Sequence, residues 1–286
     1  MLHKISKSEY EAFLDFVYGL TADLSHSSFP VYNDGVKTKE YFCKRSIKGL
    51  SSPEEEILLF EDNGMVEGWI HYYRIDADKY LGINSMLIRN GYEKALSELF
   101  DYWNLNYSGY MLALYFPEEN KDALHFMEKN GFSDICQDVV DVLLFKDYMP
   151  LAESENIVRV TSDNFEIFRS VHSRFDDEMY WSCDRIKDSL ERWRIFAYIN
   201  GGRCEGVLYY IVSKNNSASL EIFGIDYFED RYDPDVAEKL LISGLNRAKA
   251  ENAESMYFFN DKKTHKITEK LGFGYITTAH YFEVRI

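Results

Sequence analysis

The chain contains an internal repeat, and this feature constrains its fold more than any other. The stretch HFMEKNGF at residues 125–132 returns as KITEKLGF at residues 266–273. Two earlier stretches repeat in the same order: NGMVEGWIHYY at 63–73 matches NGGRCEGVLYY at 200–210, and YEKALSELF at 92–100 matches AEKLLISGL at 237–245. Three matches in one order, separated by loops of slightly different length, indicate two copies of one structural unit.

The two copies also share an order of expected elements. Each begins with a capped helix whose apolar residues have helical spacing, at 7–20 and 161–175. Two β-rich runs then flank a tight turn, which is Asn63-Gly64 in the first copy, and this pattern predicts a hairpin. A strand, a helix, a strand, a short helix and a closing strand follow. The order predicts an α+β fold of two tandem domains, each with a mixed, mostly antiparallel sheet flanked by helices.

A polar stretch that contains Pro150 lies between the copies and marks the expected domain boundary. We predict an N-terminal domain at residues 1–148, a linker at 149–156 and a C-terminal domain at 157–286. A chain of 286 residues is long enough for two domains of ordinary size.

Composition excludes several classes of partner. The net charge of −16, without a run of Lys and Arg, would repel a phosphate backbone, so we expect no nucleic-acid partner. No apolar run approaches the ~18 residues of a membrane span, and the start lacks a signal-peptide core, so we expect a cytoplasmic protein without membrane attachment. The four cysteines and the histidines lack metal-ligand spacing, and we expect no metal.

The repeated helix ending resembles a motif of the GNAT superfamily of acyl-CoA-dependent N-acyltransferases, which reads N-x-x-A-x-x-x-Y-E-K-x-G-F after the fifth strand. The matching residues of the first copy are Asn120, Ala123, Glu128, Lys129, Gly131 and Phe132. Those of the second are Glu269, Lys270, Gly272 and Phe273, with Asp261 in place of Asn. A Lys followed by a Gly also ends many ordinary helices. With the hairpins, the strand order and the duplication, however, the chain looks like a tandem GNAT protein.

The resemblance implies acetyl-CoA or another acyl-CoA as co-substrate, with its pyrophosphate held by backbone N–H groups where the third helix begins. The residues that the resemblance places at this helix start are Arg231, Val236, Ala237 and Glu238 in the second copy and Gly91 in the first. The alternative is an ordinary helix start, in which Asp233 caps the helix and Pro234 occupies its first turn. Acidic residues crowd this turn and oppose a phosphate.

Members of the family commonly use a Glu on the fourth strand as general base. Glu221 holds this position in the second copy, whereas Gly82 lies near the equivalent place in the first. The second copy is therefore the expected catalytic domain, and the first is expected to be degenerate.

The general acid of many members is the Tyr before E-K, and this chain departs from that pattern. The position holds Met127 in the first copy and Thr268 in the second, and neither can supply a proton as Tyr does. Tyr275 is the candidate substitute, with Tyr257 and His265 close to it in sequence.

The resemblance implies an N-acyltransferase that moves an acyl group, such as acetyl, to an amine of a small molecule, peptide or protein. The stretch FDDEMYWSCD at residues 175–184 suits a cationic amine, or equally an aromatic plug into the core. The alternative function is a catalytically inactive GNAT-fold pair that acts as a ligand-binding or protein-interaction module. The sequence makes no prediction of oligomeric state.

Overall fold

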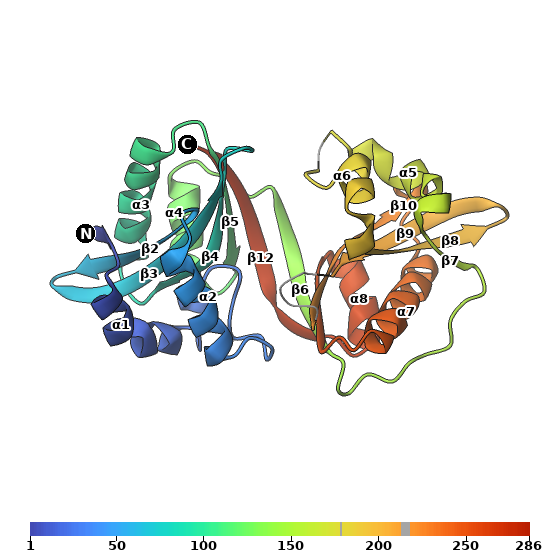
Figure 1. Cartoon of the computed structure of the whole chain (residues 1–286), viewed down its shortest axis with the longest axis horizontal. Coiled ribbons are helices and arrows are strands. Elements are labelled where there is room, and N and C mark those ends of the chain that lie inside the picture. The colour runs from blue at the N-terminus through green and yellow to red at the C-terminus, as the bar shows by residue number, and fades with distance from the viewer. Residues whose placement is uncertain (178, 213–217) are drawn as a thin grey trace. The chain divides into compact units, whose positions relative to one another are not determined.

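The computed structural model describes residues 1–177, 179–212 and 218–286, which form two units (Figure 1). Unit 1 consists of Met1–Asp138 and Thr277–Ile286, and unit 2 consists of Val139–Ile276. The division falls within two strands, β6 (Cys136–Leu144) and β12 (Gly274–Arg285).

The sheet of unit 1 has the strand order β1-β2-β3-β4-β5-β12. Its other strands are β1 (Leu2–Lys4), β2 (Glu55–Asp62), β3 (Met65–Ile75), β4 (Tyr80–Ile88) and β5 (Met111–Pro117). Neighbouring strands are antiparallel except β4 and β5, which run parallel. The β2–β3 hairpin turns at Asn63 and Gly64, which both have positive φ, as a tight two-residue turn requires. The hairpin predicted there is confirmed.

Helices cover both faces of this sheet (Figure 1). One face packs against α1 (Lys7–Leu20) and α2 (Lys39–Ser51), and the other against α3 (Tyr92–Asn106) and α4 (Lys121–Lys129). A short 3-10 helix, η1 (Leu24–His26), follows α1. Ser6 begins α1 with a capping box, in which its side chain and that of Glu9 each accept a backbone N–H of the other.

Unit 2 has the strand order β6-β11-β10-β9-β8-β7, with β10 and β11 parallel and the other neighbours antiparallel. Its further strands are β7 (Ile157–Arg159), β8 (Trp193–Asn200), β9 (Arg203–Ile211), β10 (Ser219–Tyr227) and β11 (Ser255–Asn260). Its helices are α5 (Glu166–His172) and α6 (Cys183–Asp188) on one face, and α7 (Pro234–Ala250) and α8 (Lys262–Lys270) on the other. The 3-10 helices are η2 (Ser162–Asn164), η3 (Ser173–Phe175), η4 (Leu190–Arg192) and η5 (Phe228–Asp230).

The predicted fold class is confirmed, since each unit is a mixed, mostly antiparallel sheet between helices. One helix differs from its expectation: residues 161–175 form η2, α5 and η3 rather than one continuous helix. Among the helices of the described residues, none combines the length and the apolar character that crossing a membrane requires.

The closing strands are exchanged between the sequence copies. Strand β12, at the end of the second copy, pairs with β5 in unit 1, where Ala279 lies opposite Pro117. Strand β6, at the end of the first copy, pairs with β11 in unit 2, where Val139 lies opposite Asn260. The expected domains 1–148 and 157–286 follow the repeat in the sequence, and the units divide the chain at other residues.

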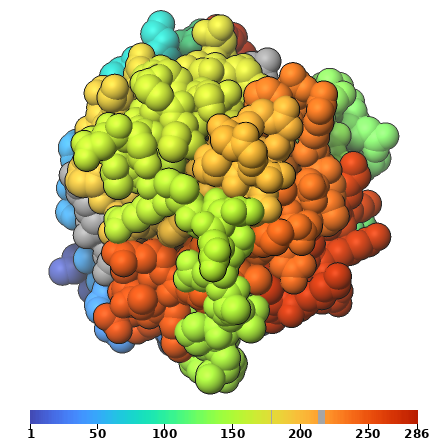
Figure 2. All heavy atoms as spheres, turned by 90° about the vertical axis from the view of Figure 1, so that its right-hand side faces the viewer, coloured from blue at the N-terminus to red at the C-terminus, as the bar shows by residue number. Residues whose placement is uncertain are grey.

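The expected linker at residues 149–156 belongs to unit 2. The Asn246 side chain of α7 donates a hydrogen bond to the carbonyl oxygen of Leu151 (2.8 Å) and accepts one from the backbone N–H of Leu151 (3.1 Å). It also accepts a hydrogen bond from the Tyr148 hydroxyl (2.9 Å). Figure 2 shows this yellow-green part of the chain lying on the surface of unit 2. The segment is therefore fixed to α7 by hydrogen bonds.

Candidate functional site

The parallel strands of unit 2 separate toward their C-terminal ends. Strands β10 and β11 pair from Ser219 and Ser255 to Ile222 and Phe258, and β10 then continues to Tyr227. Backbone N–H and C=O groups on the facing edges beyond the last pair need other partners. Strand edges of this kind are also where extended, amide-bearing ligands pair with a sheet.

A bulge marks equivalent positions in the two units. Phe223 is the extra residue of β10 opposite β9, and Asn84 is the extra residue of β4 opposite β3. Glu221 and Gly82 each lie two residues before the bulge. Glu221 and Gly82 therefore occupy equivalent positions in the two units, as the comparison of the two sequence copies indicated.

Glu221 lies on β10 beside the start of the divergence, and its side chain is exposed. Its neighbours Leu220 and Ile222 are buried in the core under α7 and α8. Because side chains alternate across a strand, Glu221 points to the other face of the sheet, where α5 and α6 pack. On β11, Tyr257 is the register partner of Glu221. Its side chain therefore lies on the same face, next to the carboxylate.

The stretch at 175–184 packs on this face through an aromatic cluster. The Trp181 ring lies 5.2 Å from the ring of Trp193 and 6.2 Å from that of Phe223. Tyr180 is 53% exposed, and its ring is covered by the Arg185 guanidinium at 4.0 Å. Trp181 thus acts as an aromatic plug, and Tyr180 leaves an aromatic edge near solvent. Glu178 in this stretch lies outside the described residues.

The residues expected at the pyrophosphate lie together at the start of α7. The Asp233 carboxylate accepts the backbone N–H groups of Asp235 (2.9 Å) and Val236 (3.4 Å). Ala237 and Val236 bury their side chains under the helix, Glu238 is half-buried, and the exposed Arg231 forms an ion pair with Glu229 at 2.6 Å. The ordinary capped helix start is therefore present, and it uses N–H groups that a phosphate would need. Gly91, with φ of 74°, begins α3 in unit 1 without a side-chain cap.

The candidate acid positions have different surroundings. Thr268 is fully buried and donates its hydroxyl to Asp141 Oδ2 at 2.6 Å, so this proton is held within the core. Met127 is fully buried in the core of unit 1. Tyr275, at the start of β12, is 48% exposed, and its ring meets the ring of His265 edge to face at 5.7 Å.

Solved structures resemble this chain, although no family model and no curated protein matches its sequence. A GCN5-related N-acetyltransferase from Sphaerobacter thermophilus matches with a TM-score of 0.65 and 10% identity, over 99% of this chain and 95% of that chain. A second GCN5-related N-acetyltransferase, from Kribbella flavida, matches with a TM-score of 0.54 and 10% identity, over 85% of this chain and 93% of that chain. A tandem GNAT protein from the clavulanic acid biosynthesis pathway matches with a TM-score of 0.52 and 11% identity, over 99% of this chain and 98% of that chain. The chain has the fold of the GNAT superfamily.

In unit 1 of this GNAT fold the Tyr73 side chain lies over Gly82, the position equivalent to Glu221 of unit 2. A Cβ atom at Gly82 would lie 2.4 Å from Cζ of Tyr73, which belongs to the neighbouring strand β3. The phenol ring therefore fills the space in which a side chain from this position of β4 would lie.

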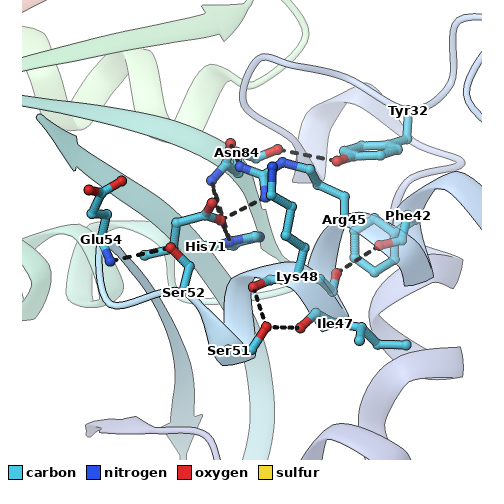
Figure 3. A network of polar contacts seen from close by, with 12 residues as sticks. Tyr32, Phe42, Arg45, Ile47, Lys48, Ser51, Ser52, Glu54, His71 and Asn84 are labelled. Carbon is cyan, nitrogen blue, oxygen red and sulfur yellow. Dashed lines mark hydrogen bonds and ion pairs between the residues drawn. The ribbon is translucent and has the colours of Figure 1, made fainter. Parts of the chain in front are cut away.

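A polar network of Glu55, Arg45, His71 and Asn84 occupies that face of unit 1. Glu55 accepts hydrogen bonds from Arg45 Nη1 (2.7 Å) and His71 Nε2 (2.8 Å), and Arg45 Nη2 donates to Asn84 Oδ1 (2.8 Å). Figure 3 shows Arg45, His71 and Asn84 turned toward one another. Burial alone would raise the pKa of Glu55, but the hydrogen bonds from His71 and Arg45 outweigh it and lower the pKa to about 2. These groups satisfy one another, which indicates a structural network.

A buried histidine was missed at the sequence level and connects the aromatic stretch to the end of β10. His172 is fully buried, with Nδ1 at 2.7 Å from Asp226 Oδ2 and Nε2 at 2.8 Å from the carbonyl oxygen of Trp181. Both partners are acceptors, so both ring nitrogens must donate, as in the imidazolium form. Burial by itself would lower the pKa of His172, but the hydrogen bonds to Asp226 and to the Trp181 carbonyl outweigh it and raise the pKa above its usual value.

This raised pKa predicts a pH-dependent stability. A group whose pKa is higher in the folded state contributes stability that is complete below its unfolded pKa of about 6.5 and is lost as pH rises through the folded value. Urea unfolding of the parent from pH 6 to pH 9 should show this loss, and the His172→Gln variant should lack it. His125→Gln, at an exposed position, is the control. Equal pH slopes for the parent and His172→Gln would contradict the assignment.

Among the described residues, no group of three or more His, Cys, Asp or Glu side chains is arranged to hold a metal ion. In unit 2 the strand register brings together one carboxylate, Glu221, and one phenol, Tyr257, beside the diverging strands, whereas the contact described for Tyr275 is with His265 of α8.

Proposed function

We propose that the protein is an acyl-CoA-dependent N-acyltransferase and that the reaction takes place in unit 2. Acetyl-CoA or another acyl-CoA is the donor, and an amine of a small molecule or peptide is the acceptor. The observation that carries the proposal is Glu221, an exposed carboxylate on β10 beside the point where β10 and β11 separate. The equivalent position in unit 1 is Gly82, covered by Tyr73.

The proposed chemistry needs one base and one proton donor. Glu221 takes a proton from the acceptor ammonium, directly or through water, so that the free amine can attack the thioester carbonyl. The C–N bond forms, the C–S bond breaks, and the departing thiolate needs a proton. Tyr275 is the donor indicated by the sequence, and Tyr257 is the phenol beside Glu221 in the strand register.

The start of α7 is the proposed contact for the pyrophosphate, at Arg231, Val236, Ala237 and Glu238. The Asp233 carboxylate already accepts two of the N–H groups there, and acidic neighbours oppose a phosphate. The fit to a pyrophosphate is therefore weak, and most of the affinity for acyl-CoA is proposed to come from its amide-bearing pantetheine arm at the diverging strands. We propose a cytoplasmic site of action.

The acidic turn at α7 also favours a second candidate function, a catalytically inactive GNAT-fold pair that binds a ligand or a protein. Calorimetric titration with acetyl-CoA separates the two. Binding with turnover of at least one amine supports the enzyme. Absence of heat and of thermal stabilisation at millimolar acetyl-CoA would exclude it, and binding without turnover over a broad amine panel would favour the second candidate.

The Glu221→Gln variant tests the site within unit 2. General-base catalysis typically contributes about 10²–10⁴-fold, so acyl transfer to every accepted amine should fall by a factor in this range. Binding of acetyl-CoA should persist, because the amide keeps the size of the side chain. Glu254→Gln, at an exposed carboxylate just before β11, is the matched control and should retain full activity. A Glu221→Gln enzyme as fast as the parent would refute the site.

A further inference from the structure

In unit 1 the chain itself occupies the space between the diverging parallel strands. Strands β4 and β5 pair from Tyr80 and Met111 to Gly82 and Ala113, and β4 then continues to Ile88. Beyond this point the facing edges carry backbone groups that lack a partner strand, as in unit 2. Residues 26–29, which we call the strap, lie across this space.

The strap is hydrogen-bonded to both strands at once. The backbone N–H of Ser28 donates to the carbonyl oxygen of Met86 on β4 at 2.9 Å. The next N–H, that of Phe29, donates to the carbonyl oxygen of Tyr115 on β5 at 2.8 Å. Two consecutive residues therefore bridge the two edges, as the amides of a bound extended ligand would do.

Two helix starts hold the strap from the other side. The Asn120 side chain, fully buried, donates from Nδ2 to the carbonyl oxygen of Ser27 at 2.8 Å. Its Oδ1 accepts the N–H of Ala123 and so caps α4. The Tyr92 hydroxyl, on the first residue of α3, donates to the carbonyl oxygen of His26 at 3.0 Å. The motif residue Asn120 thus has a role in unit 1 beyond capping its helix.

The strap is also part of the core. Ser27 and Ser28 are each 1% exposed, and the ring of Phe29 meets that of Tyr115 edge to face at 6.4 Å. Ser27 forms an antiparallel bridge with Leu87 of β4. An extended ligand could enter only by displacing these contacts, because its N–H groups would need the same carbonyl oxygens.

The corresponding connection of unit 2 is described at residues 173–177 and 179–182. It packs through Trp181 on Trp193 and Phe223, and the Trp181 carbonyl accepts a hydrogen bond from His172. Of the described residues in this connection, none donates a backbone N–H to β11. In its described residues this connection is therefore held by the aromatic contacts of Trp181 and by the hydrogen bond from His172.

We propose that the strap is an internal occupant of the ligand slot of unit 1, so that the chain binds at most one acyl-CoA, in unit 2. The binding of one acyl-CoA per chain rests on the proposed function. The occupation of the unit 1 slot by the strap does not. The strap takes the place of the amide-bearing arm of the donor, and unit 1 is closed to acyl-CoA by its own backbone rather than by the loss of a catalytic side chain alone.

Hydrogen exchange and titration together test this proposal. The Ser28 and Phe29 amides should exchange slowly, and added acetyl-CoA should leave their exchange unchanged. Calorimetric titration of the parent should give one acetyl-CoA per chain. Three results would each refute the proposal that the strap occupies the slot. They are fast exchange of both amides, faster exchange on adding acetyl-CoA, and binding of two acetyl-CoA molecules per chain. Protected amides with no binding at all would support the strap and contradict the proposed function, so the two failures are distinguishable.

The Asn120→Asp variant weakens the strap selectively. A carboxylate oxygen keeps the acceptor that caps α4, but it cannot donate to Ser27 and repels its carbonyl oxygen. Asp261 caps α8 in the same way, through the N–H groups of Lys263 and Thr264, so Asp at this helix start is compatible with the fold. Exchange of the Ser28 and Phe29 amides should accelerate about tenfold, with α4 still protected.

The reciprocal variant Asp261→Asn, in unit 2, is the matched control and should leave both amides protected. Unchanged exchange of the Ser28 and Phe29 amides in Asn120→Asp, with α4 still protected, would overturn the contribution of Asn120 to the strap.

Discussion

Replacing Asp141 with alanine should lower the free energy of unfolding by about 3–5 kcal/mol, the range for removing one partner from a buried charged cluster. Asp141 lies on β6 and is fully buried. Its carboxylate accepts hydrogen bonds from Asn260 Nδ2 (2.9 Å) and Thr268 Oγ1 (2.6 Å), and His265 Nδ1 lies 3.0 Å away. The variant would remove the charged acceptor that these polar groups of β11 and α8 share and leave a cavity in its place. Asn260 and Thr268 would keep only their hydrogen bonds to backbone carbonyl oxygens.

Urea unfolding, followed by far-ultraviolet circular dichroism, measures this change. Asp147→Ala, a few residues further along the chain and exposed, is the control and should change the free energy of unfolding by no more than about 0.5 kcal/mol. A loss below about 1 kcal/mol in Asp141→Ala would show that the cluster is not formed as described. Thr268→Val should reproduce part of the loss, because it removes one of the donors and leaves the carboxylate in place.

The second large effect is expected from Gly49→Ala in α2. A Cβ atom at Gly49 would lie 2.3 Å from Nε2 of His71, whose ring is buried and hydrogen-bonded to Glu55. The ring cannot move without breaking that bond and disturbing the network with Arg45 and Asn84. Overpacking of this kind costs about 1–3 kcal/mol, and the damaged polar network adds to it, so a loss of about 2–4 kcal/mol is expected.

Gly19→Ala in α1 is the matched control for this substitution. Gly19 is also a helical glycine of unit 1, but no atom lies within 4 Å of the Cβ that alanine would add. Alanine there should stabilise the protein by up to about 1 kcal/mol, because it restricts the unfolded chain and favours a helix. Thermal and urea unfolding of both variants measure the difference. If Gly49→Ala were as stable as Gly19→Ala, the close approach of α2 to His71 would be refuted.

Local patterns in the sequence predicted most of the elements. The Asn63-Gly64 turn, the alternation of the flanking runs and the capped helix starts are properties of neighbouring residues, so the hairpins and the α+β order could be read directly. The repeat of E-K-x-G-F then related the two copies to each other. The region at 161–175 was less regular than predicted, because a helical pattern of apolar residues does not exclude short 3-10 turns.

Contacts between distant residues could not be read in this way. The pattern of β6 and β12 predicts strands, but alternation does not specify which sheet a strand completes. Tyr257 is the neighbour of Glu221 only through the parallel register of β10 and β11. The strap and the close contact of Gly82 with Tyr73 likewise depend on three-dimensional packing, and they explain the degenerate appearance of the first copy better than its missing motif residues do.

The exchange of closing strands has a consequence for the order in which the chain can fold as it is synthesised. The first unit includes Thr277–Ile286, the last residues of the chain. Strand β12 pairs with β5, so this edge of β5 stays unpaired while the second copy is being synthesised. An unpaired edge that waits for a distant segment folds slowly and invites pairing with other chains. Unit 2, by contrast, is one uninterrupted segment, Val139–Ile276, so all of it is synthesised before the strand that completes the first unit.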